Sequence, residues 1–460
     1  YRMSMTIEEM IKKQQEYFAA GKTCELAQRI QALNRLEQGI LNCEQELYAA
    51  LKKDLGKSRA ESYMCEVGLT LSELRFAKKH VQKWSREKRV PTPLAQFHAR
   101  SFTVQEPYGV VLVMSPWNYP VLLTLEPLIG ALAAGNCCVL KPSAYSPATS
   151  AVMKKMIADV FPEEYVTVIE GGREENQNLL SQKFDYIFFT GGVQVGKMVM
   201  EKAAANLTPV TLELGGKSPC IIDKSANLKL TAKRLAFGKY LNCGQTCVAP
   251  DYVLVHEAVK EEFLKLLKSE IRAMYGEDPL KNPDYGKMIN RKHFDRVLGL
   301  MKEEKLILGG ENDTASLRIA PAVMDQVTED DAVMQEEIFG PLLPVLTVGS
   351  MEEAIAFVNR RPKPLALYLF TENREAEKNV LEYTSFGGGC INDTIIHLAT
   401  SQMGFGGVGN SGMGSYHGKK SFETFSHEKS IVKKYTWMDL PMRYQPYTGW
   451  KEKLVRMFLK

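Results

Sequence analysis

The chain has 460 residues, of which 45% are hydrophobic and 24% charged, and its formal net charge is +4. This composition is typical of a globular protein with a large core and roughly two to three domains, and it excludes a wholly disordered or fibrous chain. The 58 basic residues are nearly balanced by 54 acidic ones, so nothing favours a nucleic-acid partner.

Helices are expected first, because apolar residues recur at helical spacing over 7–55 and about 60–85. A strand is expected at 99–104. Short apolar strands then alternate with helices: strands at 109–114, 137–140, 166–170, 186–190 and 210–214, and helices at 121–134, 148–160, 175–182 and 196–206. This alternation predicts βαβ units and a parallel sheet covered on both faces.

The second half repeats the pattern less regularly. Helices are expected at 228–241, 257–275 and 352–359, and strands at 252–255, 305–308 and 365–370, before a glycine-rich region at 386–418. The predicted fold class is therefore α/β, with two α/β domains joined by little linker.

The nine cysteines are scattered and form no CxxC pair, which argues against a disulfide scaffold and predicts no metal site. Reduced thiols are expected of a cytoplasmic protein, and residues 1–5 lack the apolar core of a signal peptide. The stretch 107–125 carries no charge, but its internal prolines, Pro116 and Pro120, would break a membrane-spanning helix.

Cys247 lies in the sharpest local signal, the segment 240–249. Gly244 lets the backbone turn as the preceding helix ends, and the turn could present the Cys247 thiol to a cleft. A thiol there could attack a carbonyl carbon if its pKa is lowered. The alternatives are a simply buried cysteine or a disulfide or metal pair with Cys243.

Further polar residues follow the expected parallel strands, where open α/β sheets place their ligands. Glu213 ends one strand between leucines and could act as a general base; the alternative is a strand-edge ion pair. The turn from Gly191 and Gly192 to Gly196 could bind an anion such as pyrophosphate, although it lacks the GxGxxG spacing. Lys141 follows another strand, and Asn118 could donate its amide to an oxyanion.

Together these pieces resemble the aldehyde dehydrogenase superfamily over nearly the whole chain. The resemblance is carried by segments 115–120 (SPWNYP), 141–143 (KPS), 189–192 (FTGG), 212–217 (LELGGK), 244–247 (GQTC), 337–341 (EIFGP) and 410–414 (NSGMG). The segments GQTCVAP and SFETFS look like the class 3 branch, which is typically dimeric and oxidises aromatic and medium- to long-chain aliphatic aldehydes.

The resemblance implies a role for each matched residue. Cys247 would form a thiohemiacetal and then a thioester, which water activated by Glu213 would hydrolyse, and Asn118 would hold the oxyanion. Glu337 would bind the nicotinamide ribose, with Phe339 near the ring. The other implied cofactor contacts are Lys141, Ser115, Trp117, Gly191, Gly192, Gly196, Leu214 and Gly215.

The resemblance also implies the division of the chain. Residues 1–82 and 104–212 would form a Rossmann-like NAD(P)-binding domain and 213–418 the catalytic domain. Residues 83–103 and 428–437 would form a small β arm that joins two subunits into a homodimer. A basic, amphipathic tail, 438–460, could touch a membrane surface weakly.

Two positions depart from the family pattern. Ala144 stands where a glutamate commonly binds the adenine ribose, and its lack of charge predicts that NADP is accepted as well as NAD. Val193 replaces a frequent polar residue in the glycine turn, which weakens the assignment of phosphate contacts there. Alternative functions are a CoA-acylating aldehyde dehydrogenase, a thiol esterase using Cys247 without redox chemistry, or a binding protein on the same scaffold.

Overall fold

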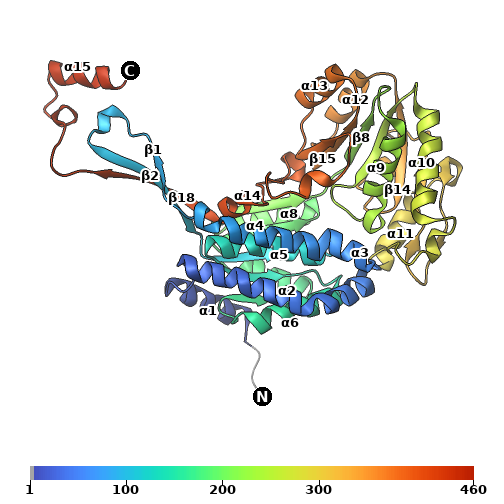
Figure 1. Cartoon of the computed structure of the whole chain (residues 1–460), viewed down its shortest axis with the longest axis horizontal. Coiled ribbons are helices and arrows are strands. Elements are labelled where there is room, and N and C mark those ends of the chain that lie inside the picture. The colour runs from blue at the N-terminus through green and yellow to red at the C-terminus, as the bar shows by residue number, and fades with distance from the viewer. Residues whose placement is uncertain (1–4) are drawn as a thin grey trace.

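The computed structural model describes residues 5–460. Two α/β bodies lie side by side, and a three-stranded arm projects from one of them (Figure 1). The first four residues of the expected first domain, and most of the segment tested for a signal peptide, lie outside the described residues.

The first body contains a six-stranded sheet. Its strands are parallel except for β17, which pairs antiparallel with β7. In spatial order they are β17 (Gly412–Met413), β7 (Val210–Leu214), β6 (Tyr186–Gly191), β3 (Val110–Met114), β4 (Cys137–Lys141) and β5 (Val166–Val168).

Helices cover both faces of this sheet. On one face lie α1 (Ile7–Ala19), α7 (Arg173–Ser181) and α8 (Val193–Ala204). On the other lie α2 (Leu26–Leu55), α4 (Gly68–Trp84), α5 (Pro120–Ala134), α6 (Pro147–Val160) and α14 (Lys419–Thr424). The short helix α3 (Arg59–Ser62) lies between α2 and α4 in the chain.

Two-sided burial explains the uniformly apolar strands. Along β3, Val111 and Val113 join the core under α5, whereas Val110 and Leu112 join the core under α1 and α8. Helix α5 is buried along its whole length, as expected of a helix that is apolar all round. Among the described residues, no helix combines the length and the apolar character that crossing a membrane requires.

The second body contains a seven-stranded sheet, parallel except at β10. Its strands, in spatial order, are β10 (Leu306–Leu308), β13 (Ala322–Met324), β14 (Leu342–Val348), β9 (Pro250–His256), β8 (Ser218–Ile222), β15 (Ala366–Phe370) and β16 (Gly388–Ile391). Around it lie α9 (Leu228–Tyr240), α10 (Lys260–Tyr275), α11 (Arg291–Leu300), α12 (Met351–Asn359) and α13 (Arg374–Tyr383), with a small hairpin of β11 (Asn312–Asp313) and β12 (Arg318–Ile319).

The arm consists of β1 (Lys88–Val90), β2 (Ala99–Pro107) and β18 (Ser426–Lys434). Strand β18 brings the end of the chain back along β2, and α15 (Gly449–Phe458) lies beside the tip of the arm, far from the second body (Figure 1).

The expected α/β fold class is confirmed, and nearly every expected helix and strand is present. Four strands of the second sheet, β8, β13, β14 and β16, were not identified from the sequence. Pro219 and Pro344 interrupt the apolar patterns of β8 and β14. The expected domain boundary after residue 212 falls inside β7. The domain division itself stays a prediction.

Candidate active site

The strands of the first sheet end together and collect the polar residues expected there. In register, Met114 of β3 lies beside Lys141 of β4, and Thr190 of β6 lies beside Glu213 of β7. Ser115 follows β3, donates its backbone N–H to the Lys141 carbonyl at 3.2 Å and pairs its hydroxyl with that of Thr124 at 2.6 Å. The carboxyl edge of this sheet therefore forms one wall of a site.

Cys247 is presented by a tightly wound loop after α9. Asn242, Cys243 and Gly244 have left-handed φ values of 53°, 56° and 76°, a conformation that only glycine adopts without strain. A Cβ on Gly244 would lie 2.1 Å from the Gly340 carbonyl oxygen. The expected turn at Gly244 is confirmed, and its lack of a side chain lets the loop that carries Phe339 approach.

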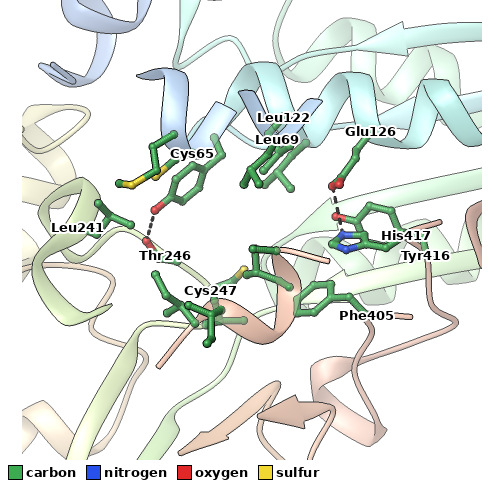
Figure 2. Close-up of a pocket in the computed structure, with 18 of the residues that line it drawn as sticks. Cys65, Leu69, Leu122, Glu126, Leu241, Thr246, Cys247, Phe405, Tyr416 and His417 are labelled. Carbon is green, nitrogen blue, oxygen red and sulfur yellow. Dashed lines mark hydrogen bonds and ion pairs between the residues drawn. The ribbon is translucent and has the colours of Figure 1, made fainter. Parts of the chain in front are cut away.

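The Cys247 side chain lines an apolar cavity of about 230 Å³ between the two bodies. Figure 2 shows it opposite Leu69 of α4 and Leu122 of α5, with Phe405 on the same side as the thiol. Burial raises the pKa of Cys247 to about 12, and the carboxyl groups of Glu337 and Glu213 act in the same direction. The thiol is therefore neutral until a base or a bound ligand changes its surroundings.

Cys243 does not share this cavity. It is fully buried in the second body, where its thiol lies 3.5 Å from the Tyr285 hydroxyl. All nine cysteines lie among the described residues and are free. Residues 5–460 contain no group of three His, Cys, Asp or Glu side chains placed to hold a metal ion.

Glu213 is buried at the end of β7, and neither of its carboxyl oxygens has a hydrogen-bond partner among the described residues. Burial raises its pKa well above the ordinary value. Gly412 of β17 lies directly beside it. An isolated carboxyl group with a raised pKa, close enough to affect the Cys247 thiol, can exchange a proton with a bound water or substrate.

The Asn118 side chain lies next to the Cys247 loop. Its amide Nδ2 donates to the Gln245 carbonyl at 3.2 Å, and its Oδ1 has no partner in the described part of the chain. The backbone carbonyl of Asn118 accepts from Asn242 Nδ2 at 2.8 Å. The amide is thus held against the loop that carries Cys247, and a primary amide so placed can stabilise an oxyanion that develops at the thiol.

Glu337 packs against the glycine pair that follows β7. A Cβ on Gly215 would lie 2.1 Å from Glu337 Oε2, and the Gly216 N–H donates to the carboxyl group. Burial and the charge of Asp251 raise the pKa of Glu337 to about 8. The ring of Phe339 meets that of Trp117 edge-on, with centroids 5.4 Å apart.

A buried ion pair fixes the loop that carries Glu337. Lys217 Nζ lies 2.5 Å from Asp251 Oδ1 and donates to the carbonyls of Val333 and Glu336, each at 2.8 Å. Asp251 Oδ2 accepts from the Ile338 N–H at 3.0 Å. The Lys217–Asp251 pair therefore holds the backbone on both sides of Glu337, at Val333, Glu336 and Ile338, in place.

The remaining expected cofactor residues lie around the start of α8. Gly192 is exposed and precedes the helix, whose first N–H groups have no side-chain cap, so this terminus is open to an anion. Gly196 is buried one turn further on, where a Cβ would lie 2.5 Å from Leu214. Its N–H donates to the Gly192 carbonyl, so Gly196 and Leu214 shape the site by packing.

Lys141 is buried, and its ammonium donates to the Pro142 carbonyl at 2.8 Å. Burial lowers the pKa of Lys141, while Glu175 and Glu170 raise it. Ala144 is exposed on the loop that follows. The Cys247 thiol thus lines the cavity, with Glu213 close enough to act on it and Asn118 bonded to its loop. The other expected residues lie at the ends of β3 and β4, around the start of α8 and on the loop that carries Glu337 and Phe339.

Sequence reasoning missed several buried charges around this site. Glu126 and His417 lie 3.2 Å apart at one end of the cavity (Figure 2). Burial acts to lower the pKa of His417, but the charges of Glu126 and Glu73 raise it overall. One signal was available, because Glu126 is the only charge in the apolar helix α5.

Comparison with known proteins gives one consistent result. Residues 2–431 match the model of the aldehyde dehydrogenase family. The chain is 47% identical to 4,4'-diaponeurosporen-aldehyde dehydrogenase of Staphylococcus aureus over 99% of both chains, and 44% identical to mouse aldehyde dehydrogenase family 3 member B1 over 96% of this chain and 95% of the relative.

Solved structures agree. The substrate-bound state of Staphylococcus aureus AldH matches with a TM-score of 0.98 and 46% identity, over 99% of this chain and 100% of that one. An indole-3-acetaldehyde dehydrogenase solved with NAD⁺ matches with a TM-score of 0.85 and 26% identity, over 93% and 88%. This chain belongs to the aldehyde dehydrogenase family, a family of oxidoreductases, and its relatives include members of family 3.

Proposed function

We propose that this enzyme oxidises aldehydes to carboxylic acids through a covalent intermediate on Cys247. The observation that carries the proposal is a thiol that lines an apolar cavity, with an unpartnered buried carboxyl group close enough to act on that thiol and a side-chain amide bonded to the loop that carries it. Once a base has taken the thiol proton, the Cys247 sulfur adds to the aldehyde carbon, and the resulting oxyanion is stabilised by the Asn118 amide. Loss of hydride leaves a thioester, and Glu213 takes a proton from the water that hydrolyses it.

The residues around Glu337 suit a nicotinamide dinucleotide. The bare Gly215–Gly216 backbone, the open N-terminus of α8 and the buried Lys141 ammonium offer contacts for ribose hydroxyls, pyrophosphate and a further ribose. A bound nicotinamide would supply the hydride acceptor. The family is NAD-dependent, and the neutral Ala144 adds the proposal that NADP is also used, although the acidic Glu175 near Lys141 opposes a phosphate there.

The cavity favours an apolar aldehyde. Its lining includes Leu69, Leu122, Phe237, Leu241 and Phe405, and almost no polar surface faces it. Such a wall stabilises a hydrocarbon chain or an aromatic ring by removing it from water. We therefore propose medium- to long-chain aliphatic or aromatic aldehydes as substrates; the Staphylococcus aureus relative is likewise named for an aldehyde, 4,4'-diaponeurosporen-aldehyde.

Nicotinamide absorbance tests the proposal. The purified protein is mixed with a panel of aliphatic and aromatic aldehydes and with NAD⁺ or NADP⁺, without coenzyme A. Reduction that disappears in Cys247→Ser is expected. Activity only after coenzyme A is added would favour the acylating type instead, and cleavage of an activated ester by Cys247 without any cofactor reduction would favour a thiol esterase.

The arm and the tail carry proposals about assembly and location. We propose that residues 83–103 and 428–437 pair with a second subunit to give a homodimer in the cytoplasm, where the nine free thiols stay reduced.

The tail helix α15 exposes Trp450, Met457 and the adjoining Leu459, which supports weak contact with a membrane surface. Light scattering tests the dimer, and co-sedimentation of full-length and 1–445 chains with liposomes tests the tail.

A further inference from the structure

A buried ion pair from the N-terminal helices reaches the active site. Lys57 follows α2, and Glu66 lies in the π-helical turn Tyr63–Val67 before α4. Their side chains are fully buried, and Lys57 Nζ lies 2.7 Å from Glu66 Oε2. Burying two charges carries a large desolvation cost, so such a pair is weak evidence of a contribution to stability alone.

Both members of the pair bind the segment 118–122. Lys57 Nζ donates to the Asn118 carbonyl at 2.9 Å and lies 4.0 Å from the centroid of the Tyr119 ring. Glu66 Oε1 accepts from the N–H groups of Val121 and Leu122 at 2.9 and 3.3 Å. No side chain of α5 itself caps its N-terminus, so Glu66 supplies the missing cap from another part of the chain.

The same segment is tied to the Cys247 loop from the other side. Asn242 donates from Nδ2 to the Asn118 carbonyl at 2.8 Å and from its N–H to Glu61 Oε1 at 2.9 Å. The Tyr119 hydroxyl pairs with that of Thr246 at 2.7 Å. The Asn118 backbone therefore has no freedom to shift without breaking contacts to both the N-terminal helices and the thiol loop.

We propose that Lys57 and Glu66 are positioning residues for the reaction: they fix the Asn118 peptide so that the Asn118 amide meets the oxyanion formed at Cys247. The inference rests on the proposed function and deepens it. Lys57 acts through the Asn118 carbonyl, and Glu66 acts through the start of α5. Both side chains are fully buried and bonded to each other and to the segment 118–122, so they act through that segment and neither is a catalytic residue.

The test removes both charges together, because removing one would leave a buried charge unpaired. In Lys57→Met/Glu66→Gln, kcat is expected to fall by about 10- to 100-fold, since a small misplacement of a catalytic group costs about that much. The dissociation constant of the cofactor, followed by protein fluorescence, is expected to stay within about twofold.

A double-mutant cycle separates positioning from general damage. Asn118→Ala alone is expected to lower kcat by about 10²- to 10³-fold, the usual effect of losing one oxyanion donor. Adding Lys57→Met/Glu66→Gln to it is expected to lower kcat no further, because the pair acts through that amide. The inference would be overturned if the two sets of substitutions lowered kcat independently, so that their fold-changes multiplied in the combined variant. It would also be overturned if the charge-free variant, Lys57→Met/Glu66→Gln, kept a kcat within about twofold of the parent.

Two further variants keep the test decisive. Lys260 and Asp325 form a largely buried ion pair, 3.0 Å apart, on the second body, so Lys260→Met/Asp325→Asn is the matched control that changes stability but not kcat. Should Lys57→Met/Glu66→Gln fail to fold, Lys57→Gln/Glu66→Gln also removes both charges and keeps a donor for the Asn118 carbonyl and an acceptor for the two N–H groups. Any fall in kcat that this variant causes in the parent enzyme is expected to be absent when residue 118 is already alanine. A fall of the same size in the Asn118→Ala enzyme would overturn the inference.

The outcomes also separate this inference from the proposed function. Absence of Cys247-dependent cofactor reduction by the parent enzyme would remove the proposed function and the inference with it. An active parent that is impaired by Asn118→Ala but not by the charge-free variant would remove the inference alone. An active parent that tolerates Asn118→Ala would show that Lys57 and Glu66 do not act through this amide.

Discussion

The reacting side chains and the charged side chains that support them differ in how many hydrogen-bond partners they have. Both oxygens of Glu213 and one oxygen each of Glu337 and Asn118 lack partners within residues 5–460. The supporting ammonium groups of Lys57 and Lys217 each have two or three partners within 2.9 Å. Leaving a buried polar atom without a partner costs free energy, and the unpartnered atoms of Glu213, Glu337 and Asn118 lie where a substrate, a water or a cofactor would supply the missing partner.

This contrast teaches how the site combines reactivity with rigidity. An unpartnered carboxyl group has a raised pKa and can take up a proton, while a fully bonded ion pair resists movement. The enzyme keeps the two kinds of group on neighbouring segments, so that each reacting side chain has a firmly held backbone. Substitutions on the two sides should therefore have different signatures.

The largest effect is expected at the thiol. Cys247→Ser should lower kcat by about 10⁴-fold or more, because the hydroxyl is a far weaker nucleophile and no other group replaces it. Binding of the cofactor should persist, and calorimetric titration with NAD⁺ can check it. Loss of both activity and cofactor binding would point to a disturbed fold rather than a missing nucleophile.

The raised pKa of the thiol gives a pH prediction for the free enzyme. Below a pKa of about 12 the thiolate fraction grows about tenfold with each pH unit. Alkylation of Cys247 by iodoacetamide should therefore accelerate by about 10³-fold between pH 7 and pH 10, without levelling off. Mass spectrometry can follow the modified site, with Cys247→Ser as the control, and a plateau near neutral pH would contradict the buried, neutral thiol described here.

On the supporting side, Lys217→Met/Asp251→Asn should release the loop that carries Glu337. The KM for NAD⁺ is expected to rise by about tenfold, since several hydrogen bonds that hold the loop are lost, whereas the KM for the aldehyde should change little. Steady-state kinetics with each substrate varied in turn measures both. A selective rise in the aldehyde KM would mean that this loop serves the substrate instead.

The smallest effect concerns the cofactor's second ribose. Ala144→Glu should lower kcat/KM for NADP⁺ by about 5- to 10-fold, because a carboxylate repels a phosphate across partly screened solvent. Activity with NAD⁺ should stay within about twofold. If kcat/KM fell equally with NAD⁺ and NADP⁺, Ala144 would have no role in cofactor preference.

Much of this fold could be predicted from the sequence, because strands buried on both faces appear as short apolar runs that alternate with helices along the chain. The candidate residues after those strands, Glu213 and Lys141 among them, were also identifiable, since parallel strands end at one edge. Gly244 could be predicted because few residues other than glycine accept a turn of that kind.

Other features depend on contacts between distant segments. Lys57 and Glu66 look like solvated helix charges in the sequence, and only their burial against residues 118–122 reveals them. Gly196 was expected to contact a phosphate, yet its close packing on Leu214 depends on how α8 crosses β7. The lack of partners for Glu213 likewise follows from the whole environment and from no local pattern.

The most direct test of the account is a rapid-quench experiment on Glu213→Gln, with NAD⁺ and an apolar aldehyde but without coenzyme A. The account predicts a burst of about one NADH per active site, with an acyl group on Cys247 detected by mass spectrometry, followed by turnover about 10²- to 10³-fold slower than in the parent enzyme. Turnover at the parent rate, or a burst without acylated Cys247, would contradict it.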